Sequence, residues 1–576
     1  MPTDDPRSSQ SLNSATGASS FRLVSFCFFL SGMAGLIYQM VWMRYLSTVF
    51  GTSELAIIAV LVAYMGGLAA GAWLASRYLH RLTRPIIAYA LLEAAIALSA
   101  IAVPLLLKLS GHLRTTVLGG QNHLPSDGGA LEAISHLGLA CLVLFIPTAC
   151  MGATLPILAK GLIQQQTQIG TRIGWLYALN TFGAVAGTLL AAFLLIPSLG
   201  LWKASFFGVA LNLTVAALGW SVARKAGAKS ISPPKSGNPE KSSAFTASSK
   251  IILPVMLVSG ATSFVYEVLW ARLLAHVLGG SFYSFATMLA SFLTGIAVGG
   301  LIGAKLARDS RRSCFWLAGF EIATGLLTAL ILALVSSGNL GASGSSILAQ
   351  AGVCILVLSP ATICLGATFP LAVRALSDRA RDAGPASGRV YAWNTVGAIA
   401  GAITAGLLII PNLGYAPTFK WAIVTNLLLA VIILRAVNGV SPKILATAAA
   451  VCFAAVILYH PKPPVDLLTR SPLDHSDDVH KKLKLIHVAT GKSATVSVLE
   501  RSGNFVIRSN GLQEAEIFPK GAEALAYTKI RWLPALPRFS NPMPNPCLSS
   551  DMVAGLSSKP SPPVSGKSTS SKSKKK

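Results

Sequence analysis

The chain has 576 residues, of which 53% are hydrophobic and only 12% are charged. A soluble domain carries about 25% charged residues, so this chain has too few charges to solvate the surface of a soluble protein of its size. Long apolar runs recur from Phe21 to Tyr459, and such runs indicate membrane spans. This excludes a soluble globular enzyme for most of the chain, and also a coiled coil, a disulfide scaffold and a disordered protein.

The net charge is strongly positive, because 47 Lys and Arg residues against 21 acidic ones give a formal +26. The basic residues gather in short loops between the apolar runs, which is the positive-inside pattern of polytopic membrane proteins. We therefore expect no nucleic-acid partner. We expect an integral multi-pass protein of a bacterial cytoplasmic membrane, with the lipid bilayer as its partner and its N-terminus and basic loops in the cytoplasm.

The hydropathy pattern predicts thirteen spans, with a disordered N-terminus before them and a flexible basic linker between the sixth and the seventh. The disordered N-terminus covers residues 1–20 and the linker covers residues 223–250. The first six spans are 21–41, 55–75, 85–107, 134–157, 173–196 and 203–222, the next six are 251–270, 283–304, 314–335, 347–371, 390–410 and 418–435, and the extra span is 443–459.

After Pro461 the composition turns polar. Residues 483–517 alternate between apolar and polar side chains, and Asn510-Gly511 supplies a turn signal, which predicts a small β hairpin or meander. Residues 541–576 are dominated by Pro, Ser and Lys. That composition predicts a disordered basic tail.

The two sets of six spans are copies of each other, residues 21–222 forming the first repeat and residues 251–435 the second. An even number of spans separates matching elements, so both repeats have one orientation, as in the two halves of major-facilitator transporters. The expected fold is an all-α polytopic membrane protein with two parallel six-helix repeats, about one extra span, a small β segment and a disordered tail. The matching segments are Ser31–Arg44 with Ser259–Arg272, Gly67-x3-Gly71 with Gly295-x3-Gly299, Glu93 with Glu321, Gly152–Pro156 with Gly366–Pro370, Tyr177–Gly187 with Tyr391–Gly401, and Pro197-x2-Gly200 with Pro411-x2-Gly414.

Glu93 and Glu321 lie inside apolar runs at matching places in the two repeats. A carboxylate at membrane depth costs several kcal/mol, so it faces a cavity or a partner. One interpretation is a cation or proton site near the repeat interface. The other is a protonated or paired Glu near a helix end that fixes helix packing.

Four further polar residues are candidates for an intramembrane polar site. Asn180 and Asn394 lie beside the Gly-x3-Gly pairs, where we expect them to hydrogen-bond across helices. Arg44 and Arg272 end the first span of each repeat. They either pair with carboxylates such as Glu267 or extend to the membrane surface beside aromatic residues.

Pro156 and Pro370 each remove a backbone hydrogen bond inside a span. The result is either a plain packing kink or a broken helix that lines a binding cavity. No catalytic constellation is recognisable, and the eight cysteines form no CxxC pair, so we expect no metal site and no redox role.

With these residues assembled, the chain resembles the membrane region of fused spermidine-synthase-like proteins. The likeness is carried by the paired Tyr-x3-Trp-x-Arg-x-Leu, Gly-Ala-Thr-x-Pro and Tyr-x2-Asn-Thr-x-Gly-x3-Gly segments over about residues 21–460, and more weakly by Thr490–Glu500 and Asn510–Leu512. The resemblance implies a major-facilitator-like membrane domain before an aminopropyltransferase domain that uses decarboxylated S-adenosylmethionine. No counterpart of the Rossmann-like catalytic domain follows Ala535.

Three interpretations therefore remain open. The first is a polyamine-related membrane protein that lacks aminopropyltransferase activity and binds no cofactor in this chain. The alternative is a transporter that moves a polyamine or small cation through the repeat interface. A structural membrane scaffold or a frameshifted product is the third reading.

Overall fold

The computed structural model describes residues 6–50, 54–117, 130–225, 249–278, 281–336, 347–377, 379–437, 459–469, 483–491 and 494–517, with single residues between 441 and 458. In this part of the chain, 11 continuous helical stretches are long and apolar enough to cross a membrane. One of them, Gln166–Lys225, holds two spans, because the backbone turns at Gly200 with φ 75°. The described residues therefore form twelve spanning helices, six in each repeat.

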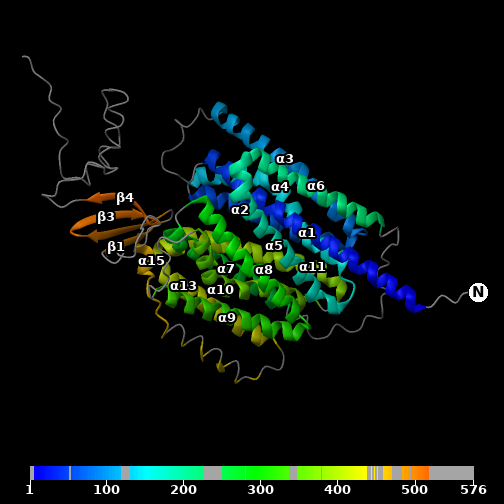
Figure 1. The fold of residues 1–576 in the computed structure, drawn as a ribbon. Coiled ribbons are helices and arrows are strands. Elements are labelled where there is room, and N and C mark those ends of the chain that lie inside the picture. Colours follow the sequence, from blue (N-terminus) through cyan, green and yellow to red (C-terminus); the bar gives the residue numbers. More distant parts are fainter. Residues whose placement is uncertain are drawn as a thin grey trace, which may run out of the picture.

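The helices follow the two predicted sextets in chain order (Figure 1). Most extend beyond the apolar run that predicted them, because hydropathy marks only the part of a helix that lies in the hydrocarbon. The first repeat comprises α1 (Pro6–Phe50), α2 (Glu54–Tyr78), α3 (Pro85–Val117), α4 (Ala130–Leu162), α5 (Ile169–Leu190) and α6 (Ile196–Lys225), and the second comprises α7 (Ser249–Leu278), α8 (Phe282–Leu306), α9 (Ser310–Ser336), α10 (Ile347–Leu376), α11 (Ala383–Thr404) and α13 (Tyr415–Ala436).

Matching helices pack in matching ways inside the two repeats. In the first repeat α1 packs on α5, α2 on α4, and α3 on α6; in the second α7 packs on α11, α8 on α10, and α9 on α13. The repeats meet mainly through two related pairs, α2 with α11 and α5 with α8. This is the expected major-facilitator-like fold of two parallel six-helix repeats.

Glycine allows the closest of these helix crossings. A Cβ atom added to Gly183 on α5 would stand 1.9 Å from the carbonyl oxygen of Phe29 on α1, and one added to Gly397 on α11 would stand 1.8 Å from that of Leu257 on α7. No side chain fits into such a contact. The Gly-x3-Gly pairs therefore mark the places where helix backbones touch.

A small antiparallel sheet follows the helices, which confirms the predicted β segment. Its strands are β1 (Lys484–Thr490), β2 (Thr495–Arg501), β3 (Asn504–Ser509) and β4 (Leu512–Ile517), paired in the order β1-β2-β3-β4. Asn510 and Gly511 turn the chain between β3 and β4 with positive φ, as Asn-Gly pairs do in tight hairpins.

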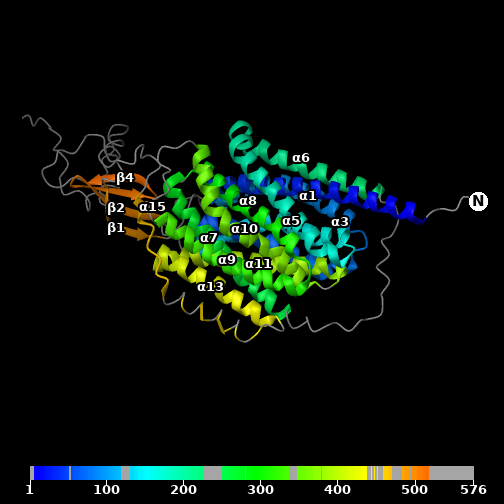
Figure 2. The same ribbon diagram turned by 60° about the horizontal axis from the view of Figure 1, so that its bottom comes forward.

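The sheet lies at the end of the helical bundle opposite the N-terminus (Figures 1 and 2). There the hydroxyl of Tyr415, at the start of α13, lies 2.6 Å from that of Thr495, and Thr490 donates a hydrogen bond to the carbonyl of Ile410. From Tyr415 the 22 residues of α13 run about 33 Å to the other end of the bundle. The short helix α15 (Val465–Thr469) again contacts β2. The chain between α13 and α15 therefore connects opposite ends of the bundle.

Four other predicted segments compare with the structure as follows. The extra span at 443–459 and the linker at 223–250 fall mostly outside the described residues, and the tail at 541–576 lies wholly outside them. The expectation of a disordered N-terminus over residues 1–20 differs from the structure, in which α1 begins at Pro6. Extending an existing helix costs far less than nucleating one, so the membrane helix continues into a polar stretch.

Gly414 should be costly to replace, because its φ of 78° and ψ of −177° lie in a region that only glycine adopts readily. We expect Gly414→Ala to lower the free energy of unfolding by about 1–3 kcal/mol. Gly319 is the matched control, since a Cβ atom there meets no atom within 4 Å and its φ is not positive. Thermal unfolding in detergent should show Gly319→Ala to be neutral or slightly stabilising. Equal losses in both variants would contradict the backbone explanation.

Candidate functional site

The buried carboxyl group of Glu321 lies at the centre of a fully paired polar cluster in the second repeat. On α9, Glu321 accepts hydrogen bonds from the Ser259 hydroxyl of α7 at 2.7 Å and from the Asn426 amide of α13 at 2.6 Å. Asn426 in turn accepts from the Tyr266 hydroxyl of α7 at 2.9 Å. All four side chains are buried. The cluster ties three helices together in a low-dielectric interior, where such bonds are strong.

The matching cluster in the first repeat is built from α1, α3 and α6 and is not fully paired. Glu93 of α3 accepts a hydrogen bond from the Asn212 amide of α6, and the hydroxyls of Ser31 and Tyr89 bond to the same carboxyl. The amide oxygen of Asn212 and the hydroxyl of Tyr38 have no hydrogen-bond partner among the described residues. The two clusters thus have the same plan but differ at the asparagine oxygen, which accepts a hydrogen bond from tyrosine only in the second repeat.

Sequence reasoning found Glu93 and Glu321 but missed their asparagine partners. Asn212 and Asn426 are single polar residues in apolar spans. The same number of residues separates them as separates Asn180 from Asn394. This repeated position was the signal that would have identified them.

The structure does not bring Glu93 and Glu321 together. The helix that carries Glu93, α3, packs mainly on α4, α6 and α1 of its own repeat, and α9 packs mainly on α10 and α13 of the other. Each carboxyl group therefore lies inside one repeat. The predicted location near the repeat interface does not match the structure, because the helices that form that interface are α2, α5, α8 and α11.

The other predicted polar residues occupy helix crossings and helix ends. Asn180 of α5 donates a hydrogen bond to the carbonyl of Phe28 on α1 at 3.1 Å. Asn394 lies at the matching crossing of α11 with α7, where a Cβ atom on Gly260 would stand 2.1 Å from its carbonyl oxygen. Both residues lie where helix backbones touch, which leaves little room for a ligand.

The two arginines lie near the end of the bundle that carries the sheet. The guanidinium of Arg44 is 4.7 Å from the centre of the Phe282 ring of α8, so it makes a cation–π contact between the repeats. Arg272 donates hydrogen bonds to the carbonyls of Gly406, after α11, and Gly491, after β1. Arg272 therefore fastens the sheet to the second repeat.

The helices that contain Pro156 and Pro370 are continuous. Both α4 and α10 run through their prolines, and the hydroxyls of Thr154 and Thr368 donate to backbone carbonyls one turn earlier, each at 2.6 Å. These side chains thus bond to the backbone next to each proline. The packing-kink interpretation fits this geometry, and the broken-helix interpretation does not.

Glu267 is an acidic residue in the membrane part of α7 that belongs to neither cluster. It is half-buried, and no hydrogen bond or ion pair joins it to another described side chain. The matching residue of the first repeat is Gln39 of α1. An ionisable side chain this deep in a membrane helix faces protein or water rather than lipid. Glu267 and Gln39 are therefore partly exposed polar residues at matching places in the first helix of each repeat.

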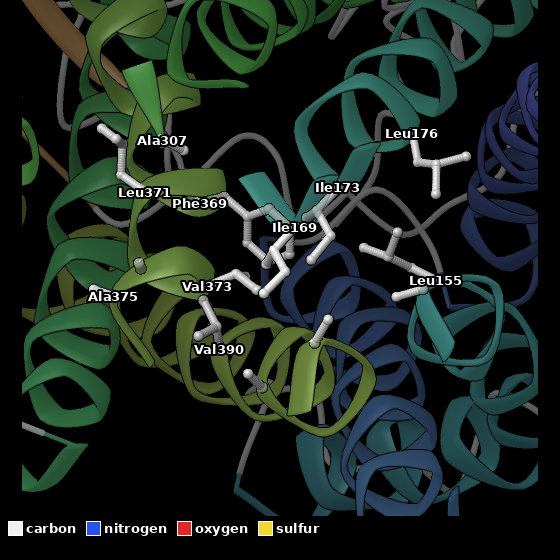
Figure 3. Close-up of a cluster of buried hydrophobic side chains, with 14 of the residues drawn as sticks. Leu155, Ile169, Ile173, Leu176, Ala307, Phe369, Leu371, Val373, Ala375 and Val390 are labelled. Carbon is white, nitrogen blue, oxygen red and sulfur yellow. The ribbon is translucent and has the colours of Figure 1, made fainter. Parts of the chain in front are cut away.

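The two repeats share one apolar core, at the end of the bundle away from the sheet. Figure 3 shows this cluster, to which the C-terminal halves of α4 and α10 contribute Leu155 and Phe369 and the starts of α5 and α11 contribute Ile169 and Val390. Phe369 stacks on Tyr177 of α5 with ring centres 4.6 Å apart. In contrast, the N-terminal halves of α4 and α10 belong to two different cores. Through α4, α5, α10 and α11 the two repeats thus share one core at this end, which we call the closed end. Toward the sheet, α4 and α10 pack in separate cores.

The basic loops lie at this closed end. Arg77 lies in the last turn of α2 and Arg81 follows that helix, while Arg308 follows α8 and Arg311 lies in the first turn of α9. Lys160 of α4 donates hydrogen bonds to the carbonyls of Leu79 and Leu82. Arg374 is the matching residue of α10 and donates to the carbonyls of Arg308 and Ser377. The closed end is therefore the positively charged end of the molecule.

Comparison with known proteins gives fold neighbours but no family. No family model matches the chain, and no curated protein matches it. Among solved structures, a bacterial homologue of the iron transporter ferroportin in an outward-facing state with soaked iron is similar over 73% of this chain and 99% of its own, with 14% identity and a TM-score of 0.48. The E. coli fucose:proton symporter FucP is similar over 73% and 98%, with 16% identity and a TM-score of 0.46.

The resemblance to fused spermidine-synthase-like proteins is not supported beyond its major-facilitator-like part, since no family model or curated relative carries it. The motifs that carried the resemblance are largely the glycines, asparagines and prolines of helix crossings. Such positions serve packing, so they report fold rather than activity.

Proposed function

We propose that this chain is a membrane transporter whose two repeats rock against each other. The observation that carries the proposal is the core that α4, α5, α10 and α11 share at one end of the bundle, while the N-terminal halves of α4 and α10 lie in separate cores toward the other end. A protein that is closed at one end, and whose two halves meet along two related helix pairs, is built for alternating access.

The contacts between the repeats suit such a motion. Gly174 of α5 lies against Ala304 and Gly300 of α8, and Gly388 of α11 lies against Ala72 and Ser76 of α2. Side chains this small leave smooth surfaces that let two helices slide or tilt without exchanging interlocked side chains. The internal repeat relates the α5–α8 contact to the α2–α11 contact, so one rocking motion changes both contacts.

The substrate class we propose is a small cation, with a polyamine as the first candidate. Glu267 is the observation that supports a cationic substrate, because it is an acidic side chain in a membrane helix without a basic partner among the described residues. The polyamine candidate comes from the motif resemblance. The positive-inside rule places the basic loops in the cytoplasm, so the closed end would face the cytoplasm.

Uptake into proteoliposomes tests this function. We expect vesicles that contain the protein to take up labelled putrescine faster than empty vesicles, and we expect Glu267→Gln to lower the initial rate at least tenfold. Glu514→Gln is the matched control, because Glu514 is an exposed acidic residue of β4.

Three outcomes are distinguished by this design. Uptake equal to that of empty vesicles for putrescine and for small inorganic cations would overturn the transporter proposal and favour a structural membrane protein. Uptake that Glu267→Gln leaves unchanged would retain transport and remove Glu267 from the substrate path. Equal losses in Glu267→Gln and Glu514→Gln would indicate a general charge effect.

A further inference from the structure

We propose that one face of the small sheet is the docking surface for a downstream segment of this chain, residues 522–533. Strand register defines the two faces of the sheet, because residues paired across neighbouring strands point to the same side. One side, which we call the outer face, is apolar across β2, β3 and β4. Its members are Val496, Val498, Phe505, Ile507, Leu512, Ala515 and Ile517.

The outer face is open to solvent, whereas the opposite face is polar and buried. Val496 is 38% exposed, Leu512 37% and Phe505 36%, and the other members are partly exposed. The opposite face holds polar residues that are each at most 3% exposed, namely Thr495, Ser497 and Arg508. A sheet with one covered face normally turns its polar side chains to water. Here the apolar face is the open one, so the described residues leave it incompletely covered.

The helical bundle contacts the polar face. Thr490 and Thr495 are register partners on that face, and they bond to the bundle through the carbonyl of Ile410 and the hydroxyl of Tyr415. Val488, on the same face, packs against the core of the second repeat. The sheet projects from the end of the bundle (Figures 1 and 2). A cover for the outer face therefore comes from outside the described helices.

The sequence that follows β4 has the chemistry to supply this cover. The last residue of β4, Ile517, belongs to the outer face. Between residues 522 and 533, apolar side chains recur at the spacing of one helix face, and Pro534 ends the pattern. The apolar positions are Ala522, Leu525, Ala526, Ile530 and Leu533. A helix whose apolar stripe lies on an apolar sheet face is one of the basic layer arrangements of proteins.

The short connection to the sheet favours this segment over a separate molecule. Residues 518–521 can extend by about 14 Å at most, so the segment begins beside the sheet. Such a tether corresponds to an effective concentration of about millimolar, with which a second copy of the chain must compete. Docking removes apolar area of both partners from water, which stabilises the docked arrangement. The inference concerns how the sheet is completed, and it does not depend on transport.

Limited digestion of the full-length protein with trypsin tests the docking. Lys529 and Arg531 lie inside the segment, while Lys567 and Lys572 lie in the basic tail. The protein is held in phosphatidylcholine nanodiscs, which keep detergent away from the outer face. We expect cleavage after Lys529 and Arg531 to be at least tenfold slower than cleavage after Lys567 and Lys572, because a docked helix must leave the sheet before a protease can cut it.

Substitutions on both partners locate the contact. Phe505→Asp places a charge on the outer face and should accelerate cleavage after Lys529 at least tenfold without changing the rate after Lys567. Ser502→Asp is the matched control, because it adds the same charge at an exposed position in the turn between β2 and β3. Leu525→Asp should release the segment equally. It changes no residue of the sheet, so the test remains decisive if Phe505→Asp disrupts the sheet.

Four outcomes would overturn the proposal. Equal cleavage rates after Lys529 and Lys567 in the wild type would show that the segment is not docked. Protection that persists in both Phe505→Asp and Leu525→Asp would place the segment elsewhere, and equal release in Ser502→Asp would indicate a general charge effect. Finally, a disulfide between two molecules of Phe505→Cys, detected by its mass, would show that a second copy covers the outer face.

Discussion

Replacing Gly174 with leucine is expected to reduce transport to the level of empty vesicles. A Cβ atom at this position would lie 2.4 Å from the Cβ atom of Ala304 and 2.9 Å from the carbonyl oxygen of Gly300. A leucine side chain therefore forces α5 away from α8. Overpacking of this kind costs about 1–3 kcal/mol. Because α5 and α8 belong to different repeats, the leucine destabilises the arrangement in which these two helices are in contact.

A graded series separates this effect from unfolding. Gly174→Ala, Gly174→Val and Gly174→Leu should lose uptake progressively, and Gly388→Leu should reproduce the loss at the α2–α11 contact, where a Cβ atom would lie 2.7 Å from the carbonyl oxygen of Ala72. Gly319→Leu, at an exposed position of α9, should transport normally. Normal uptake by Gly174→Leu would mean that transport does not depend on the contact between α5 and α8.

Much of the fold could be predicted from the sequence, because the bilayer imposes strong rules. The length of each apolar run identifies a membrane span. The repeated order of Gly, Pro, Trp and Glu positions identifies two parallel repeats of six helices. The Asn510-Gly511 pair indicated a hairpin, because few residues tolerate its backbone angles. These features depend on local chemistry, and so the structure reproduces them.

The contents of the polar clusters could not be predicted in the same way. Hydropathy shows that Glu93 lies within the membrane but not which helix faces it, since that depends on how α3 packs against α1 and α6. One of the two interpretations placed Glu93 and Glu321 near the repeat interface, because a carboxyl group at membrane depth needs a cavity or a partner. Here each acid turns inward to an asparagine of its own repeat. A search for polar residues repeated between the sextets would have found those asparagines.

The difference between the two clusters suggests that matching sites in the two repeats have different roles. Both repeats satisfy their carboxyl groups internally, but only in the second does the asparagine oxygen accept a hydrogen bond from tyrosine, whereas the Asn212 oxygen has no partner among the described residues. Gly208 and Tyr89, which stand where the second repeat has Ala422 and Leu317, are the substitutions that separate the repeats at this point. The second cluster then serves mainly to hold α7, α9 and α13 together, and this role has a measurable size.

Glu321→Ala is accordingly expected to lower the free energy of unfolding by about 3 kcal/mol, because it leaves the Asn426 amide and the Ser259 hydroxyl without their acceptor and creates a cavity. Unfolding in mixed detergent micelles measures this loss. Glu93→Ala should cost a similar amount, since that carboxyl is likewise bonded to serine, asparagine and tyrosine side chains. Glu514→Ala, at an exposed site, should stay within about 0.5 kcal/mol of the parent. A loss in Glu321→Ala no larger than that in Glu514→Ala would contradict the role of the cluster in holding α7, α9 and α13 together.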